Sequence, residues 1–418
     1  MKKRQILLPV LFALAAGFVV LKYNRDENDK AATVYLLKER TASSAQSEEW
    51  KSVKKRFDEL MRIVRTNPAD LPSRISLTAL YIQEARVTGN YMYYDMAAMK
   101  YVNEVLEKDS ANFEALIYKS LLFLSQHHFA EGLAMAEKAR ETNPYNAFVY
   151  GILIDGNVEM GDYASAIKNA DQMISIRPDI RSYSRISYLR EIHGDYPGAI
   201  EAMTMAVKAG VPGDEATEWS RVQLGHLYEY ESKLDNAAMC YEQSLQNRPL
   251  YPYAIAGQAR LSVIAKDYKR AVSYYLQADS LIHDYSFKEE LLDIYQLTGQ
   301  KEKANEVATF LLDAMNKDAQ RGVDDDNIGH YADRELATTY VKTGNFEKAL
   351  EHALAEYKRR PGNIDVNETV AWVYYKKGEA KQALPYLTEA LKTNSQNPTL
   401  LYHARLIYAK LGDKIKAQ

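Results

Sequence analysis

Cysteine is almost absent from the chain, and the residues that most often hold zinc are few and scattered. The 418 residues include one cysteine and eight histidines. A single cysteine excludes an internal disulfide, and the wide spacing excludes zinc motifs built from closely spaced cysteine and histidine pairs. Cys240 lies within a helical stretch and is expected to be a small buried hydrophobic residue. We therefore expect no metal ion and no cofactor.

Positive charge is not in excess, and the motifs of common enzymes are missing. The formal net charge is −3, so we expect no broad basic surface and no nucleic-acid partner. The chain contains no glycine-rich phosphate loop, no Gly-x-Ser-x-Gly and no His-Glu-x-x-His sequence. These absences, and the lack of any region large enough for a separate catalytic domain, predict that the protein is not an enzyme.

Two clusters of polar residues have the residue types of metal ligands but not the spacing. His127 and His128 are adjacent at a helix end, where neighbouring side chains diverge, so a solvated turn is expected there instead of a shared metal. Asp324–Asp326 lack the loop glycine and the twelfth-position glutamate of a calcium-binding EF-hand. We expect this acidic segment to be a solvated loop.

The N-terminus has the order of a targeting segment. Lys2–Arg4 precede an apolar run from Ile6 to Leu21, and a charged stretch follows it. A basic region before an apolar core is typical of a secretory signal or a signal-anchor. Ala13–Ala15 offers a cleavage site, but the apolar residues that continue to Leu21 favour an uncleaved anchor. A buried first helix is a third alternative. We predict a signal peptide or membrane anchor over residues 1–25 and a spacer, or a poor first helix, over 26–47.

One spacing recurs along the rest of the chain. Pro144 and Pro178 are 34 residues apart, and so are Ala237 and Ala271. Each unit carries an aromatic residue, a small residue three positions later, and an apolar run. A 34-residue period predicts a repeated helix-turn-helix unit.

Three positions repeat in phase with this period. A small residue in the second helix lets the two helices of a unit approach closely, a glycine five residues earlier ends the first helix, and a tyrosine of the first helix fills the space between units. The small residues are Gly132, Ala166, Ala199, Ala237, Ala271, Ala304, Ala349 and Ala383; the glycines are Gly161, Gly194, Gly299, Gly344, Gly378 and Gly412; the tyrosines are Tyr228, Tyr295, Tyr340, Tyr374 and Tyr408.

With these positions the chain resembles a tandem tetratricopeptide repeat (TPR) protein over residues 50–418. The resemblance implies an all-α fold, a right-handed α-solenoid of helix-turn-helix repeats. Within a solenoid over residues 48–418 we expect a capping helix (48–67), a lengthened first hairpin (72–110) with Tyr91–Tyr94 inserted before its second helix, repeats over 113–397, and a terminal helix (399–411). The second helix of one repeat is expected to run to about Gln320, before a loop at 321–327.

Three segments also resemble a subset of exported or membrane-anchored bacterial TPR proteins that have no assigned activity. They are Glu84–Gly89, Tyr188–Asp195 and Asn363–Asn367. Together with the basic N-terminus, which stays in the cytoplasm, this resemblance predicts an extracytoplasmic, periplasmic chain anchored in the inner membrane. The alternative is a periplasmic or secreted chain after signal cleavage. Contact with a membrane is expected through the N-terminal segment only.

The resemblance implies a concave groove that binds a protein or peptide partner. The chaperone-binding subclass uses a clamp of lysine, asparagine and arginine, which this chain lacks: Glu368, Thr369 and Trp372 stand at such places. Scattered arginines such as Arg181, Arg185 and Arg260 are expected to be solvated. We predict a non-catalytic scaffold of the cell envelope that holds a partner segment in its groove; the alternative is a structural or assembly subunit of an envelope transport, secretion or enzyme complex. The expected groove residues are aromatic: Tyr118, Phe148, Tyr188, Trp219, Tyr230, Tyr253, Tyr331, Trp372, Tyr375 and Tyr402.

Overall fold

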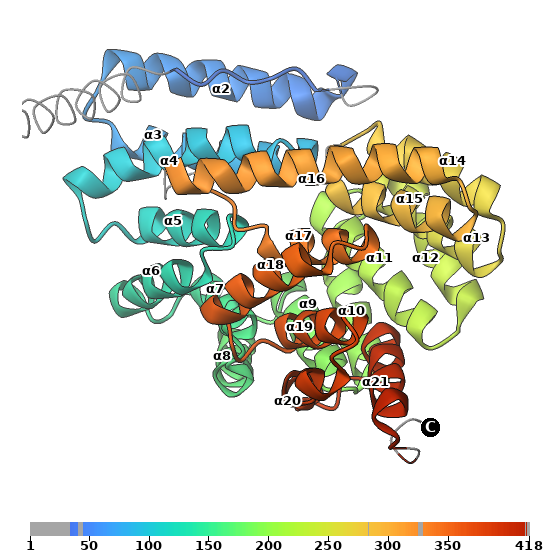
Figure 1. Ribbon diagram of the computed structural model, residues 1–418. Helices are drawn as coiled ribbons and strands as arrows, with labels where there is room; N and C mark the ends of the chain where they lie inside the picture. The colour runs from blue at the N-terminus through green and yellow to red at the C-terminus, as the bar shows by residue number, and fades with distance from the viewer. Residues whose placement is uncertain (1–33, 41–44, 283, 325–328, 414, 416–418) are drawn as a thin grey trace, which may run out of the picture.

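A computed structural model describes residues 34–40, 45–282, 284–324, 329–413 and 415. These residues form twenty α-helices, labelled α2 to α21, and no β-strand occurs among them (Figure 1). The predicted all-α solenoid is therefore confirmed for this part of the chain. No helix within these ranges has the length and apolarity needed to span a bilayer. The predicted signal or anchor (1–25) lies outside the described residues.

The helices follow one another as hairpins, each with a first and a second helix. Helix α2 (Glu48–Thr66) precedes the hairpins and α21 (Pro398–Leu411) follows them. The first helices are α3 (Leu71–Thr88), α5 (Phe113–Ser125), α7 (Ala147–Met160), α9 (Ile180–Ile192), α11 (Glu215–Tyr230), α13 (Pro252–Ile264), α15 (Tyr285–Leu297), α17 (Asp333–Lys342) and α19 (Ile364–Lys376). The second helices are α4 (Tyr91–Lys108), α6 (Phe129–Thr142), α8 (Tyr163–Ile176), α10 (Tyr196–Ala209), α12 (Leu234–Asn247), α14 (Tyr268–Asp279), α16 (Lys301–Asp324), α18 (Phe346–Arg359) and α20 (Ala380–Ala390).

The turn inside each hairpin is set by one residue with positive φ, often followed by a short polar cap. All six predicted turn glycines have φ between 72° and 85°. Hairpins without this glycine use His127, Ser232 or Lys266 there, with φ near 60°. The next residue caps the second helix in several hairpins; the Asp162 carboxylate, for example, accepts the backbone N–H of Ser165 at 3.0 Å. The predicted alanines of the second helices are all buried, so the repeat pattern is confirmed at both positions.

The first hairpin and α16 differ in detail from the sequence prediction. Tyr91–Tyr94 are the first turn of α4 and not an insertion before it, because Tyr94 is fully buried between the rings of Tyr81 and Tyr93. The extra length of this hairpin is helical, with 18 residues in each helix. Helix α16 runs to Asp324, beyond the predicted end at about Gln320. Residues 325–328 lie outside the described residues, so the predicted solvated acidic loop stays a prediction.

An extended segment, residues 34–40, lies on α3 and α4 before the first helix. The Tyr81 hydroxyl donates to the carbonyl of Tyr35 at 2.7 Å. The Arg40 guanidinium makes two bonds to the Glu84 carboxylate, at 2.6 and 3.0 Å, and both side chains are buried. A buried charge pair with this bidentate geometry fixes the segment in one place. Residues 34–40 of the predicted spacer are thus extended and packed on α3 and α4.

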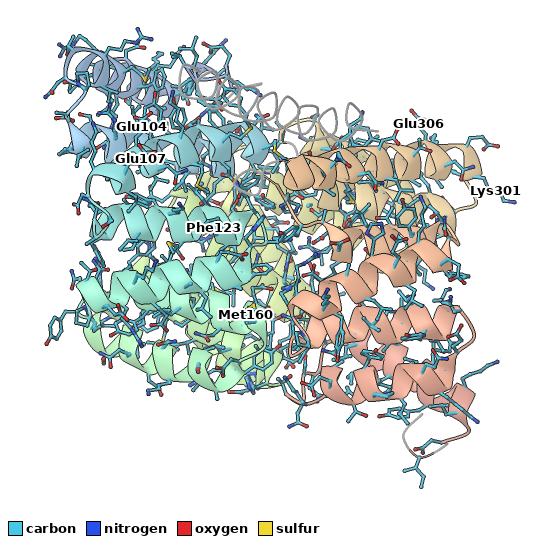
Figure 2. The ribbon with its side chains drawn as sticks, turned by 60° about the vertical axis from the view of Figure 1, so that its left-hand side comes forward. Glu104, Glu107, Phe123, Met160, Lys301 and Glu306 are labelled. Carbon is cyan, nitrogen blue, oxygen red and sulfur yellow. The ribbon has the colours of Figure 1, made fainter. Side chains whose placement is uncertain are left out.

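The hairpins wind into a superhelix whose last turns come back against its middle. Figures 1 and 2 show α17 to α21 side by side with α5 to α10, and Met160 lies close to the line where the two stacks meet. The backbone N–H of Ile364 donates to the Tyr163 hydroxyl at 2.9 Å, and the Asn363 amide donates to the carbonyl of Glu159 at 3.1 Å. Arg360 also forms an ion pair with Glu159. We call this contact of α5–α8 with residues 329–364 the closure.

Two histidines form the second part of the closure. His127 Nδ1 lies 2.9 Å from the carbonyl oxygen of Tyr331, and His128 Nε2 lies 2.9 Å from that of Gly329. The His128 side chain is only 3% exposed and stacks on the Tyr331 ring. The prediction of a solvated turn at His127–His128 is therefore wrong, because a segment two hundred residues later covers it.

Candidate interaction groove

A groove of about 1520 Å³ runs along the inner side of the superhelix. Its walls come mainly from the first helices α3, α5, α7, α9 and α11, whose successive faces line one continuous surface. The first helix of each hairpin faces the groove, and the second helix packs behind the first. The small residue of the second helix lets the two helices lie close together. The repeat geometry therefore places one helix of each hairpin at the groove.

Four of the ten aromatic residues predicted for the groove line it, namely Tyr118, Phe148, Tyr188 and Trp219. They come from α5, α7, α9 and α11, one from each of four consecutive hairpins. Tyr188 is 40% exposed, yet burial of its surroundings raises the pKa of its hydroxyl well above the ordinary value. Protein atoms crowd this side chain, and the exposed part of it faces the groove.

The other six predicted residues lie elsewhere. Tyr253 lines a smaller neighbouring cavity of about 300 Å³ and donates to Asp284 at 3.2 Å. Tyr331 belongs to the closure, where the Arg359 guanidinium lies 4.4 Å from its ring centroid. Trp372 stacks on His403 and on Tyr375, with ring centroids 3.6 and 5.1 Å apart. Tyr230 is exposed at the C-terminal end of α11, and Tyr402 is exposed within α21. Partner binding by these residues stays a prediction.

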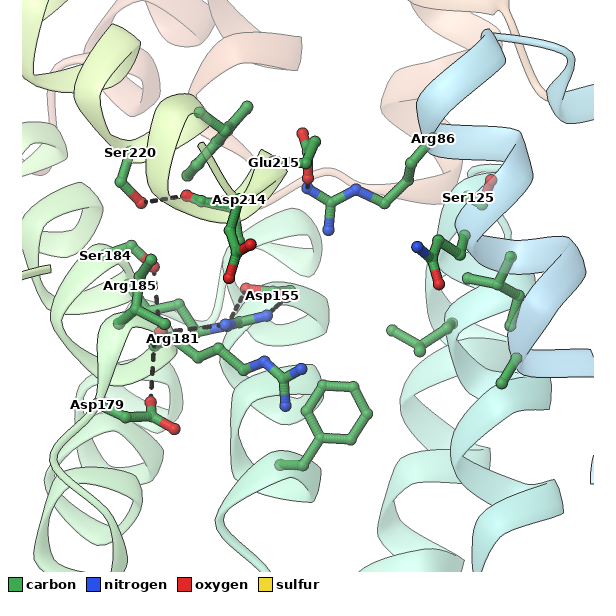
Figure 3. Close-up of a pocket in the computed structure, with 18 of the residues that line it drawn as sticks. Arg86, Ser125, Asp155, Asp179, Arg181, Ser184, Arg185, Asp214, Glu215 and Ser220 are labelled. Atoms are coloured by element: carbon green, nitrogen blue, oxygen red, sulfur yellow. Dashed lines mark hydrogen bonds and ion pairs between the residues drawn. The ribbon is translucent and has the colours of Figure 1, made fainter. Parts of the chain in front are cut away.

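Charged side chains that the repeat pattern does not mark also line the groove. Arg86 reaches from α3 to Glu215 at the start of α11, with 2.8 Å between the guanidinium nitrogen and the carboxylate oxygen (Figure 3). Arg185 makes two bonds to Asp155, at 2.6 and 2.9 Å, and also donates to the carbonyl of Gly151. The first pair links α3 to α11, four hairpins later, and the second links the adjacent hairpins of α7 and α9.

The prediction that the scattered arginines are solvated is wrong for Arg185 and Arg260, whose guanidinium groups are bound within the protein. Arg185 is bound as described above, and Arg260 donates to Glu229 at 3.1 Å and to the Tyr241 hydroxyl at 3.0 Å. Arg181 differs, since it is exposed and lies over the Phe148 ring at 4.8 Å from its centroid (Figure 3). Arg181 and Arg185 are four residues apart in α9 and therefore lie on one helical face, whereas Arg177 ends α8.

Carboxyl groups inside the groove have unusual acidity. Burial raises the pKa of Asp95 to about 7, against one hydrogen bond from the Ser125 hydroxyl that acts in the other direction. Burial and the charge of Asp365 raise the pKa of Glu191 to about 7. Within the described ranges, no three histidine, cysteine or acidic side chains are grouped so that they could hold a metal ion. The groove thus offers aromatic surface and weakly compensated negative charge.

Comparison with known proteins agrees with this architecture. Family models described as tetratricopeptide repeat match residues 334–398 and 220–249. Among curated proteins, none matches the chain. The human IFIT1 dimer with PPP-AAAA is 16% identical, with 81% of this chain and 78% of that chain covered and a TM-score of 0.50. A monomeric IFIT1 mutant with Gppp-AAAA is 14% identical, covers 80% and 75%, and has a TM-score of 0.51.

A third structure, the APC/C hetero-tetramer Cut9-Hcn1, is 14% identical and covers 86% of this chain and 67% of that chain, with a TM-score of 0.49. At such identities the IFIT1 structures are evidence for the fold alone. The matched repeat models, the hairpins with their in-phase small residues and turn glycines, and the shared solenoid fold lead to one conclusion. The chain is a tetratricopeptide repeat protein.

Proposed function

We propose that this protein is a non-catalytic scaffold of the cell envelope, which captures an extended segment of a partner protein in its groove. The observation that carries the proposal is the groove, which is lined by an aromatic residue from each of four consecutive hairpins. Aromatic side chains give large contact area at low conformational cost, and they dominate the energetics of many protein interfaces. Repeat arrays of this family generally bind proteins through such concave surfaces.

Polar groups in the same groove support an extended occupant. Arg181 is exposed there. Asp214 stands at the N-cap of α11, where its side chain makes no cap bond within the described part of the chain. A bound chain in an extended conformation needs partners for its own N–H and C=O groups along its length. Charged and polar side chains between the aromatic rings meet that need.

Replacing Phe148 and Trp219 together by alanine should weaken capture of the partner at least ten-fold, because interface aromatics of this kind contribute about 2 kcal/mol or more each. The helical content should stay as in the unchanged chain, since both residues are only partly buried. The measurement is affinity capture from envelope extracts, with circular dichroism beside it. Met239→Ala on α12, which is 66% exposed and outside both cavities, is the matched control. Undiminished capture by the double variant would refute the groove as the binding surface.

A second candidate is a structural or assembly role through the outer face. Single apolar residues are exposed on several second helices, among them Ile167, Met205, Met239 and Leu276. A photo-crosslinking residue at Tyr188 and another at Met239 separate the two candidates. Groove binding predicts adducts from position 188 alone, and docking of the outer face predicts them from position 239.

The proposed location is the periplasm, with the N-terminal segment anchored in the inner membrane. Support comes from the order of Lys2–Arg4, the apolar run to Leu21 and the charged residues that follow. Protease added to spheroplasts should digest the repeats while intact cells protect them, and the chain should sediment with membranes. Release into the periplasmic fraction would indicate a cleaved signal instead. Protection of the repeats in spheroplasts would contradict the extracytoplasmic location.

A further inference from the structure

Glu191 on α9 is a carboxylate in the groove wall that no side chain of the described residues compensates. It lines the groove beside Tyr188. Within the described part of the chain its carboxylate takes part in no hydrogen bond and no ion pair. The charge that acts on it is that of Asp365, which has the same sign. An acidic group with only an acidic neighbour is a place where a cation is missing.

Three tyrosines are close enough for the charge of this carboxylate to act on their hydroxyls. Tyr188 precedes it by one helical turn, Tyr196 begins α10, and Tyr230 ends α11. In all three, burial raises the pKa of the hydroxyl, and the charge of Glu191 raises it further. The rings of Tyr196 and Tyr230 have centroids 5.7 Å apart. Aromatic faces beside a carboxylate form the usual environment for an ammonium or guanidinium group.

The hydroxyl of Tyr196 is a second, independent sign of a missing ligand. The side chain is only 6% exposed, and its buried oxygen has no hydrogen-bond partner. Tyr163 holds the same place in the preceding hairpin, in the sequence Gly-Asp-Tyr, and its hydroxyl accepts the backbone N–H of Ile364. The closure satisfies the hydroxyl of Tyr163, whereas nothing in the described residues satisfies that of Tyr196.

The next hairpin shows what completes such a site. Glu229 precedes the small-residue position Ala237 by eight residues, as Glu191 precedes Ala199. The Glu229 carboxylate accepts the Tyr241 hydroxyl at 2.5 Å and the Arg260 guanidinium at 3.1 Å. Arg260 also lies over the Tyr241 ring, 5.5 Å from its centroid. At this position of the repeat, therefore, a glutamate and a tyrosine ring hold a cation supplied by the following hairpin.

The corresponding cation is absent at Glu191. Arg260 stands eleven residues before Ala271, and the residue eleven before Ala237 is His226. Burial and the nearby charge of Arg260 lower the pKa of His226 well below its ordinary value, so this imidazole is neutral. The hairpin of Glu191 thus keeps the carboxylate but not the positive charge, and Met203 takes the place of Tyr241. Its aromatic rings, Tyr196 and Tyr230, come from other positions of the repeat.

We propose that Glu191, Tyr188, Tyr196 and Tyr230 form a binding site for an ammonium or guanidinium group. The group is the side chain of a lysine or arginine in the captured segment, or a free organic amine. The peptide form of the proposal rests on the proposed function of the groove, while the site itself does not. The carboxylate supplies the charge, the rings contact the face of the cation, and the Tyr196 hydroxyl accepts one of its N–H groups.

The test compares cationic probes with neutral counterparts on the full chain by isothermal calorimetry and by NMR of labelled tyrosine rings. The probes are capped pentapeptides with a central lysine, norleucine, arginine or citrulline, and spermidine as a free amine. We expect the lysine or arginine peptide to bind at least ten-fold more tightly than its neutral counterpart. Glu191→Gln, which keeps the shape of the side chain, should abolish that difference. Glu201→Gln, an exposed carboxylate on α10, is the matched control and should preserve it.

The outcomes separate this site from the function of the groove. Spermidine binding that depends on Glu191, without binding of any peptide, supports the site for a free amine and counts against the groove as a peptide scaffold. Equal affinity for lysine and norleucine peptides, both lost in the Phe148 and Trp219 double variant, overturns the cation site and leaves the groove function standing. Equal affinity of the unchanged chain and Glu191→Gln for every cationic probe also overturns the site. Thermal melting of each variant confirms that it is folded.

Discussion

Gly161→Ala should open the closure and lower the free energy of unfolding by about 3 kcal/mol. Gly161 ends α7 with φ +81°, and a Cβ atom there would lie 2.1 Å from both the carbonyl carbon and the carbonyl oxygen of Gly362. Backbone cannot swing aside as a flexible side chain can, so the last hairpins must move away. The measurement is denaturant unfolding together with the radius of gyration from small-angle scattering, which should increase.

Gly344→Ala is the matched control for this prediction. Gly344 occupies the same turn position with φ +78°, but a Cβ atom there would meet nothing within 4 Å. Gly344→Ala should therefore lower the free energy of unfolding only by the strain of a left-handed alanine, about 1 kcal/mol. The radius of gyration should not change. If both variants lose the same stability and scatter alike, the contact of Gly161 with Gly362 does not hold the closure together.

The closure matters for the groove because a charge next to it acts on Glu191. Asp365 stands in the first turn of α19, just after the residues that contact Tyr163 and Glu159. Its charge contributes to the raised pKa of both Glu191 and Tyr188, which belong to α9. Opening the closure would remove this like charge and admit water. Affinity for a cationic probe is thus coupled to the shape of the whole superhelix.

The repeat units could be predicted from the sequence because each depends on contacts within about 34 residues. Ala166 is buried and Gly161 has positive φ for reasons that act inside one hairpin. Phe148 and Trp219 reach the groove for the same reason, since the face of a first helix follows from the position of the small residue.

The closure could not be predicted from the period. Small rotations between successive hairpins add up along the array. The sequence of one unit therefore does not show which earlier hairpins Pro361–Ile364 will contact. His127 and His128 are buried only because that sum places Gly329 and Tyr331 against them. Tyr331 was predicted for the groove from its phase and instead contacts His128. The difference between Glu191 and Glu229 appears only when their partners are compared, namely Tyr241 of the same hairpin and Arg260 of the next.

Asp95→Asn should stabilise the chain at pH 8 by up to about 4 kcal/mol, because one unit of pKa corresponds to about 1.4 kcal/mol. Asp95 on α4 is 4% exposed, and burial raises the pKa of its carboxyl from 3.8 to about 7. The Ser125 hydroxyl donates to one carboxylate oxygen at 2.7 Å, and the amide oxygen of an asparagine can accept the same bond. The variant therefore removes the cost of burying a charge and keeps the hydrogen bond.

The raised pKa of Asp95 determines how the stability of the chain depends on pH. The pKa of Asp95 is higher in the folded chain than in the unfolded chain, so the unfolded chain releases this proton first. The contribution of Asp95 to stability is therefore greatest below pH 4, falls as the pH rises from about 4 to about 7, and stays low above. The free energy of unfolding of Asp95→Asn should equal that of the unchanged chain near pH 4 and exceed it increasingly up to pH 7. Asp171→Asn on the exposed face of α8 should follow the unchanged chain throughout. A variant curve parallel to that of the unchanged chain would mean that Asp95 is ionised at no cost, and that water reaches it through the groove.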